Sequence, residues 1–207
     1  MFATPHHPLL LILSLVSCLS MEPARAAGLT VTVTDKAGLA SSGAAVLLEP
    51  ASGRTTVKPL PQVEVSQAKR QFNPRVTIIT VGTAVSFPNF DTVRHHVFSD
   101  SPTKKFDIKL YAGTPAKPVS FEKAGIVDLG CNIHDTMAAW IVVSDTPWYG
   151  VSGSDGTVTI DNLPAGNYRL RVWHPNMDYN TEMPPVPLTM GTADLKVGSR
   201  LTVSTGP

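Results

Sequence analysis

The sequence predicts an all-β protein, and three observations support that class. Short alternating or β-branched runs recur along the chain, among them "LTVTVTD", "VTIITV", "WIVVSD" and "TVTID". The 18 prolines and 15 glycines fall between these runs, in the manner of a sandwich or barrel. No segment sustains the hydrophobic period of an amphipathic helix. We therefore expect one large or two small β domains, because the chain is long enough for real cores.

Residues 1–26 are interpreted as a secretory signal peptide. Their apolar run ends near Leu19 and is too short to span a bilayer, and "ARA" at 24–26 is a small-x-small cleavage pattern. A second interpretation of this stretch is a lipobox, "LVSC", whose Cys18 would carry a lipid anchor. We expect a periplasmic or secreted protein, or in the alternative a membrane-anchored lipoprotein, and no membrane span elsewhere.

Composition excludes some partners and singles out one thiol. Lys and Arg total 17 against 16 Asp and Glu, so no charge surplus points to nucleic acid or to an anionic membrane surface. Cleavage after residue 26 would leave Cys131 as the only cysteine. An oxidising compartment favours paired cysteines, and a free exposed thiol there would oxidise. Cys131 is therefore buried and inert, catalytic, or bound to a metal.

The two ends of the mature chain resemble halves of one domain. Residues 29–48, "LTVTVTDKAGLASSGAAVLL", and residues 151–173, "VSGSDGTVTIDNLPAGNYRLRVW", each contain strand-turn-strand patterns. Together they resemble the carboxypeptidase regulatory-like, transthyretin-type β-sandwich. That resemblance implies halves at 27–60 and 146–207, with residues 61–145 inserted as a second domain. A plainer alternative is three tandem β units without an insertion.

The segment "GCNIHDTM" at 130–137 carries the most specific chemical signal. It sets Cys131, His134 and Met137 three residues apart in a short loop between two predicted strands, "GIVDLG" and "MAAWIVV". Thiolate, imidazole and thioether together suit a soft or borderline ion, above all copper. A second histidine from another strand would complete such a site, and "FPNFDTVRHHVFSDS" supplies His95 and His96.

These motifs resemble those of the cupredoxins, in particular plastocyanin and amicyanin. "VGTAVSFPN" is similar to the strand that leads to the first histidine ligand, "DTVRHHV" is similar to the Asp…His-x-Val pattern, and the loop has the short amicyanin-type spacing. The whole chain also resembles bacterial proteins named, loosely, for methylamine utilisation. The resemblance implies a Greek-key sandwich with one type 1 copper per chain. Its implied ligands are His95, Cys131, His134 and Met137, with His96 as the second choice for the first histidine.

Other interpretations explain these four residues less well when the residues are taken together. A buried Cys or Met taken singly is usually core packing. A catalytic Cys–His pair would leave Met137 without a role, and zinc would prefer a nitrogen, thiolate or carboxylate to a thioether. We also expect Asn89 and Asp91 to form turn hydrogen bonds before the ligand strand. Trp140 is predicted to lie in the core under the site, and Trp148 and Tyr149 near the junction of the two domains.

The predicted function is single-electron transfer by a monomeric periplasmic copper protein, not an enzyme. Its partner would be a periplasmic redox protein that docks transiently, because electron-transfer contacts are small. Two alternatives stay open. One is a copper-delivery protein, in which the ion is cargo, and the other is a structural module, in which copper stabilises the insert and the flanking sandwich binds a partner.

Overall fold

The computed structural model describes residues 27–115, 117–178 and 184–206. These residues form seventeen strands and no helix, which confirms the all-β prediction. None of their segments is a helix long and apolar enough to cross a membrane. The predicted signal peptide, with Cys18, lies outside the described residues.

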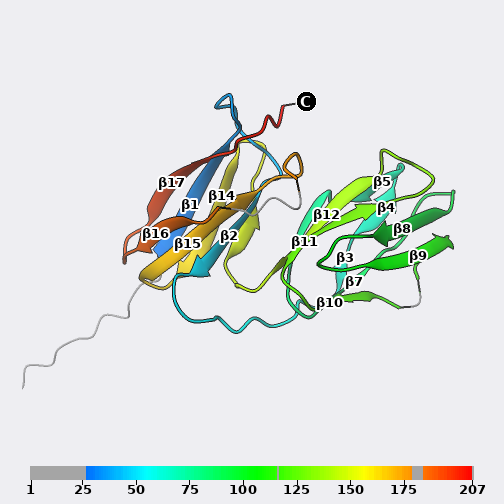
Figure 1. Cartoon of the computed structure of the whole chain (residues 1–207), viewed down its shortest axis with the longest axis horizontal. Helices are drawn as coiled ribbons and strands as arrows, with labels where there is room; N and C mark the ends of the chain where they lie inside the picture. Colours follow the sequence, from blue (N-terminus) through cyan, green and yellow to red (C-terminus); the bar gives the residue numbers. More distant parts are fainter. Residues whose placement is uncertain (1–26, 116, 179–183, 207) are drawn as a thin grey trace, which may run out of the picture.

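Strands from the two ends of the chain pair with one another in what we call the flanking sandwich (Figure 1). One sheet has the order β14-β1-β17, in which β1 is antiparallel to β14 and parallel to β17. The other has the order β13-β2-β15-β16. The strands are β1 (Ala27–Thr34), β2 (Ala45–Pro50), β13 (Tyr149–Val151), β14 (Thr157–Leu163), β15 (Gly166–Trp173), β16 (Val186–Met190) and β17 (Leu195–Arg200).

The residues between these two ends form a second set of sheets, the central sandwich. Its largest sheet has the order β6-β12-β11-β8-β9, and it is accompanied by the sheet β10-β7-β3 and the hairpin β4-β5. The strands are β3 (Val63–Glu64), β4 (Ser66–Ala68), β5 (Gln71–Asn73), β6 (Val76–Thr80), β7 (Thr83–Ser86), β8 (His95–Ser99), β9 (Phe106–Tyr111), β10 (Val119–Phe121), β11 (Gly125–Gly130) and β12 (Ala138–Ser144).

Strand alternation gives each sandwich its own core. Leu29, Val31 and Val33 of β1 are fully buried in the flanking sandwich, because residues two apart on a strand share a face. On β12 the same rule sends Ala139 and Ile141 into the core of the central sandwich, together with Cys131 and Met137. The alternate residues of β12 face the other way, toward the flanking sandwich.

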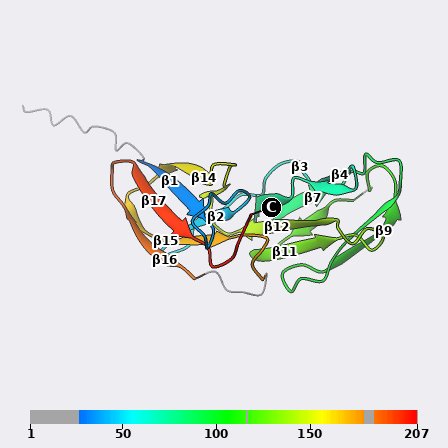
Figure 2. The ribbon, with the colours of Figure 1, turned by 90° about the horizontal axis from the view of Figure 1, so that it is seen from above.

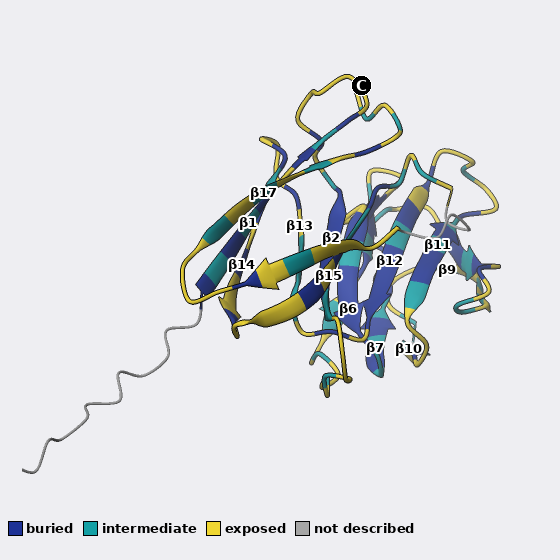
Figure 3. Cartoon of the chain, turned by 60° about the vertical axis from the view of Figure 1, so that its left-hand side comes forward, coloured by how far each residue is buried: buried dark blue, intermediate teal, exposed yellow. Residues whose placement is uncertain are grey.

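A third apolar cluster joins the two sandwiches, which lie side by side along the molecule (Figures 1 and 2). Leu47 and Trp173 of the flanking sandwich meet Val142 of the central one, and the rings of Trp140 and Trp173 have centroids 6.2 Å apart. Figure 3 shows how heavily buried the strands β2, β6 and β12 are at this junction. The expectation that Trp140 lies under the metal site is therefore wrong, because its position on β12 turns it to the junction.

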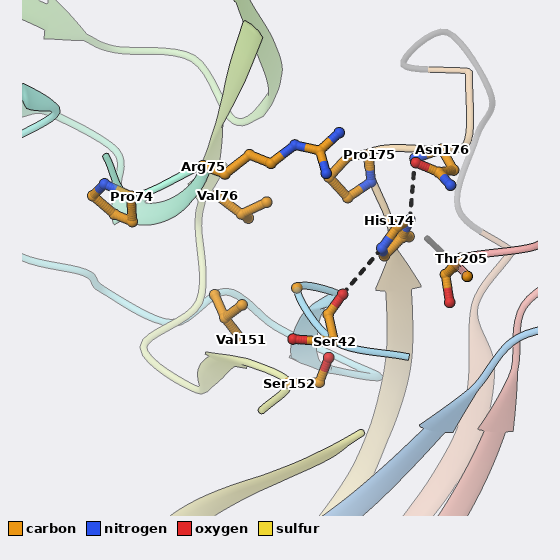
Figure 4. A pocket seen from close by; sticks show the side chains of 12 residues that line it. Ser42, Pro74, Arg75, Val76, Val151, Ser152, His174, Pro175, Asn176 and Thr205 are labelled. Carbon is orange, nitrogen blue, oxygen red and sulfur yellow. Dashed lines mark hydrogen bonds between the residues drawn. The ribbon is translucent and has the colours of Figure 1, made fainter. Parts of the chain in front are cut away.

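A cleft of about 660 Å³ opens beside this junction, lined by both sandwiches (Figure 4). His174, which is 5% exposed, donates from Nε2 to the Ser42 carbonyl and accepts at Nδ1 from the Asn176 amide, both at 3.1 Å. Burial lowers the pKa of His174, and the charge of Arg75 lowers it further, although the Ser42 hydrogen bond opposes both. The structure thus favours a neutral imidazole at this position.

Candidate metal centre

The loop that joins β11 to β12 folds into two successive turns. The His134 amide donates to the Cys131 carbonyl at 3.4 Å, and the Met137 amide donates to the His134 carbonyl at 2.9 Å. Each turn advances the chain by three residues, so the loop returns Cys131, His134 and Met137 to one neighbourhood. The three-residue spacing in the sequence is the local cause of this arrangement.

The imidazole of His95 comes from the first residue of β8, a strand that pairs with β11 through Phe98 and Gly130. His95 is fully buried, and Val97 on the same face belongs to the core of the central sandwich. The pairing of β8 with β9 shifts register between His95 and Val97. The β8–β11 pairing is what brings a residue 36 positions before Cys131 in the chain next to its sulfur.

Three potential ligand atoms converge between these two segments. The Cys131 Sγ lies 3.9 Å from His95 Nδ1 and 4.0 Å from His134 Nδ1. A ligand atom from each of the three residues falls within 4.8 Å of the other two, and the two imidazole rings have centroids 5.0 Å apart. These residues could hold a metal ion.

The spacing suits a small ion in a trigonal plane. Two nitrogens and a thiolate bonded to one ion at about 2.0–2.3 Å lie roughly 3.5–4 Å from each other. The sulfur–nitrogen separations of 3.9 and 4.0 Å are close to that range. Because the donors are one thiolate and two imidazoles, the set also matches a borderline or soft metal in its chemistry.

Burial around the three atoms is uneven. Cys131 is 5% exposed and Met137 is 2% exposed, and both belong to the hydrophobic cluster of the central sandwich. His134 is only half-buried, and its neighbour Ile133 is 48% exposed. The protein thus covers most of Cys131 and Met137, while His134 reaches the surface.

His96, the second choice for the first ligand, is directed elsewhere. Its Nε2 pairs with the carboxylate of Asp107 on β9, which also pairs with Lys109. The hydrogen bonds from Lys109 and His96 hold the pKa of Asp107 below its usual value. His95 and His96 therefore have separate carboxylate partners, and it is His95 that lies beside the thiol.

The predicted turn hydrogen bonds of Asn89 and Asp91 are confirmed. The Asp91 amide donates to the Asn89 side-chain oxygen at 2.9 Å, and Asn89 Nδ2 donates to the Val93 carbonyl at 2.9 Å. The Asp91 carboxylate also accepts from His95 Nε2 at 2.8 Å. That last contact was not expected from the sequence, although an acidic residue four positions before a candidate ligand was a signal for it.

A buried polar pair beside the site was also missed. Gln67, fully buried, hydrogen-bonds through Nε2 to the hydroxyl of Tyr111, which donates to the Phe87 carbonyl at 2.7 Å. Burial raises the pKa of Tyr111 to about 12, and the charge of Cys131 contributes to the rise. Nothing in the sequence around Gln67 marks it as a core residue.

No protein-family model matches the sequence, and no curated protein matches it. Part of the chain is similar to the copper-containing nitrite reductase of Thermus scotoductus SA-01, with 28% identity over 47% of this chain and 25% of that chain, at a TM-score of 0.39. An oxidised amicyanin variant is 21% identical over 40% of this chain and 82% of its own, at a TM-score of 0.37.

A purple cupredoxin from Nitrosopumilus maritimus is 21% identical over 40% of this chain and 100% of its own, at a TM-score of 0.35. The chain thus spans a small fraction of the nitrite reductase and most or all of the two smaller proteins. Each is a partial likeness at a low TM-score.

Proposed function

We propose that the central sandwich is a cupredoxin domain that binds one type 1 copper. His95 and His134 would bind through Nδ1 and Cys131 through its thiolate, with the thioether of Met137 as a weak axial ligand. The observation that carries this proposal is the convergence of one buried thiol and two imidazole nitrogens, His95 from strand β8 and Cys131 and His134 from the β11–β12 loop. The ligand role of Met137 is inferred from its place in the loop and its burial beside Cys131.

Copper held there would supply a one-electron couple between Cu(II) and Cu(I). The protein's part is to keep the ligand atoms fixed, because a site that reorganises little exchanges electrons readily. Hydrogen-bonded turns hold Cys131 and His134, and pairing with Tyr111 of β9 holds His95. Cys131 and Met137 are themselves largely covered by the protein, at 5% and 2% exposed.

Electrons would enter and leave at the half-buried edge of His134. Several large apolar side chains are exposed on segments adjoining the ligands. Ile133 precedes His134, Phe90 and Val93 lie in the connection that leads to His95, and Leu110 precedes the residue that pairs with His95 on β9. Exposed apolar side chains close in sequence to the ligands would suit brief contact with a redox partner.

We also propose the domain division 27–60 and 146–207 for a transthyretin-like host and 61–145 for the insert. The pairing of β1 with β14 and β17, and of β2 with β13 and β15, supports it. We further propose that the protein works in the periplasm as a monomeric electron carrier without catalytic activity.

The function is tested by loading metal-free protein with one equivalent of Cu(II) and cycling it with ascorbate and ferricyanide. We expect an intense visible band that bleaches on reduction and returns on oxidation, and that Cys131→Ser abolishes. Copper should stay bound in both states against a chelator of moderate affinity. Loss of copper to that chelator on reduction would instead indicate delivery, and absence of the band in the wild type would refute the proposal.

A further inference from the structure

The turn between β4 and β5 has an unusual backbone. Lys69 and Arg70 both lie in the left-handed region, with φ of 55° and 56°. Residues with a Cβ rarely adopt this conformation, and two in succession cost more than one. Successive amides in conformations of this kind can turn toward one point and form a concave site for an anion.

The anion at this turn is a carboxylate of the same chain. The Lys69 amide donates to Asp91 Oδ1 at 2.7 Å, and the Arg70 amide donates to Asp91 Oδ2 at 2.9 Å. Each oxygen of Asp91 thus accepts a backbone N–H, which is the arrangement of an ionised carboxylate, and such a group can only accept hydrogen bonds.

The same carboxylate reaches the first candidate ligand. His95 Nε2 lies 2.8 Å from Asp91 Oδ2, and since an ionised carboxylate has no proton to give, the proton sits on Nε2. The opposite nitrogen, Nδ1, then presents a lone pair toward Cys131 Sγ at 3.9 Å. That is the tautomer that a metal bound at Nδ1 requires.

We propose that the β4–β5 hairpin is a positioning element for the metal centre. The left-handed amides of Lys69 and Arg70 hold Asp91, and Asp91 fixes the tautomer and ring orientation of His95 before any metal binds. Lys69, Arg70 and Asp91 touch no metal in this scheme and act through His95. That the metal is copper rests on the proposed function. The positioning of His95, in contrast, is already present in the metal-free protein.

An asparagine at position 91 cannot replace the carboxylate. The three donors that meet Asp91 are two backbone amides and the Nε2–H of His95. An amide side chain offers one oxygen and one NH₂ group, so one of its two positions would set a donor against a donor. With its oxygen toward Arg70 and His95, the asparagine would set its NH₂ group against the Lys69 amide; turned the other way, it would set that group against the Arg70 amide and His95. Either orientation loosens the hold on His95, directly or through the turn that holds residue 91, while the side-chain volume changes very little.

The neighbouring pair of His96 and Asp107 provides a matched control. It joins the same residue types through the same nitrogen, but it belongs to the histidine that does not face the thiol. The Asp107 side chain is 46% exposed, against 17% for Asp91. Asp107→Asn thus repeats the chemical change without touching the proposed positioning element.

The test is nitrogen-15 NMR of the histidine rings in metal-free protein. We expect wild type and Asp107→Asn to show His95 with its proton on Nε2, and Asp91→Asn to show a mixture of tautomers. Copper affinity should fall about 10–100-fold in Asp91→Asn alone. The double variant Lys69→Gly/Arg70→Gly keeps both amides and tolerates the left-handed turn, so it should behave as the wild type.

An unchanged His95 tautomer and unchanged copper affinity in Asp91→Asn would overturn the proposal. A loss of copper affinity in the double glycine variant as large as in Asp91→Asn would also overturn it. The side-chain charges of Lys69 and Arg70, and not their backbone amides, would then be responsible for positioning His95. If the wild type lacks the expected tautomer, the positioning proposal is wrong, whether or not the protein binds copper. If it has the tautomer but gives no copper band, only the proposed function fails.

Discussion

Met137 is the residue for which two roles have to be distinguished, that of a copper ligand and that of a side chain that only fills the core. It is 2% exposed and packs in the same cluster as Cys131, which a core methionine would also do. If its sulfur bound copper, it would favour Cu(II), which accepts a further ligand more readily than Cu(I), and it would therefore lower the reduction potential. The consequence is measurable in the reduction potential and not in the stability.

Met137→Leu should raise the reduction potential of the copper-loaded protein and retain the visible band. Leucine has a similar volume, so the free energy of unfolding of the metal-free protein should fall by less than about 1.5 kcal/mol. Met190→Leu makes the same change at a residue 2% exposed in the flanking sandwich. Protein-film voltammetry of both variants is the check, and equal potentials in the two would show that Met137 is packing alone.

The sequence predicted the ligand loop well, but it gave little information about the residues that position the ligands. Regular three-residue spacing made the neighbourhood of Cys131 and His134 predictable, because two turns suffice to build it. The choice between His95 and His96 was open, since alternation says that they diverge but not which one faces inward. The contact of Asp91 with Lys69 and Arg70 spans more than twenty positions, and its left-handed residues are not glycines.

The turn before β14 joins the two halves of the flanking sandwich through a contact with β1. Gly156 has a φ of 76°, and a Cβ there would lie 2.4 Å from the Val33 carbonyl oxygen of β1. The Val33 amide donates to the Gly156 carbonyl at 2.8 Å. This turn therefore has both a conformational and a steric reason for glycine, and it ties the second half of the sandwich to the first.

Gly156→Ala should destabilise the protein more than Gly38→Ala. Gly38 has a φ of 88°, and a Cβ there would meet nothing within 4 Å, so its cost is the left-handed conformation alone, about 1–2 kcal/mol. The clash at Gly156 should add about 1–3 kcal/mol. Urea denaturation of both variants measures the difference, and equal losses would contradict the close approach of the turn to β1.

The strand patterns in the sequence predicted where the strands lie better than which side of each strand faces the metal site. The runs "VTIITV" and "WIVVSD" became β6 and β12, and β12 pairs with both β6 and β11. Both faces of β12 are covered along most of its length, so its sequence is apolar from Ala138 to Val143 and does not reveal which residues face the site. That is why Trp140 was assigned to the wrong face.

At the scale of the whole molecule, the junction between the sandwiches includes a titratable group. His174 lines the cleft beside the apolar cluster, and burial lowers its pKa from an ordinary value of 6.5. A histidine whose folded pKa lies below its unfolded pKa takes up its proton first in the unfolded chain. Its contribution to stability is therefore complete above about pH 6.5 and is lost as the pH falls through the folded pKa.

The free energy of unfolding of metal-free protein should accordingly fall between pH 7.5 and pH 5, and His174→Gln should reduce that fall. Other groups also contribute to the pH dependence of stability, so the informative quantity is the difference between the two pH profiles. Urea titrations at several pH values provide it. Parallel profiles for the wild type and His174→Gln would show that His174 is no more difficult to protonate in the folded protein than in the unfolded one.

Binding of one copper ion by His95, Cys131 and His134 is tested by the visible absorption and electron spin resonance spectra of Cu(II)-loaded protein. The wild type, His95→Ala and His96→Ala should be compared at one equivalent of copper. We expect the wild type and His96→Ala to share an intense thiolate-to-copper band and His95→Ala to lose it. Loss of the band in His96→Ala alone, or its absence from the wild type, would show that these three residues do not bind copper together.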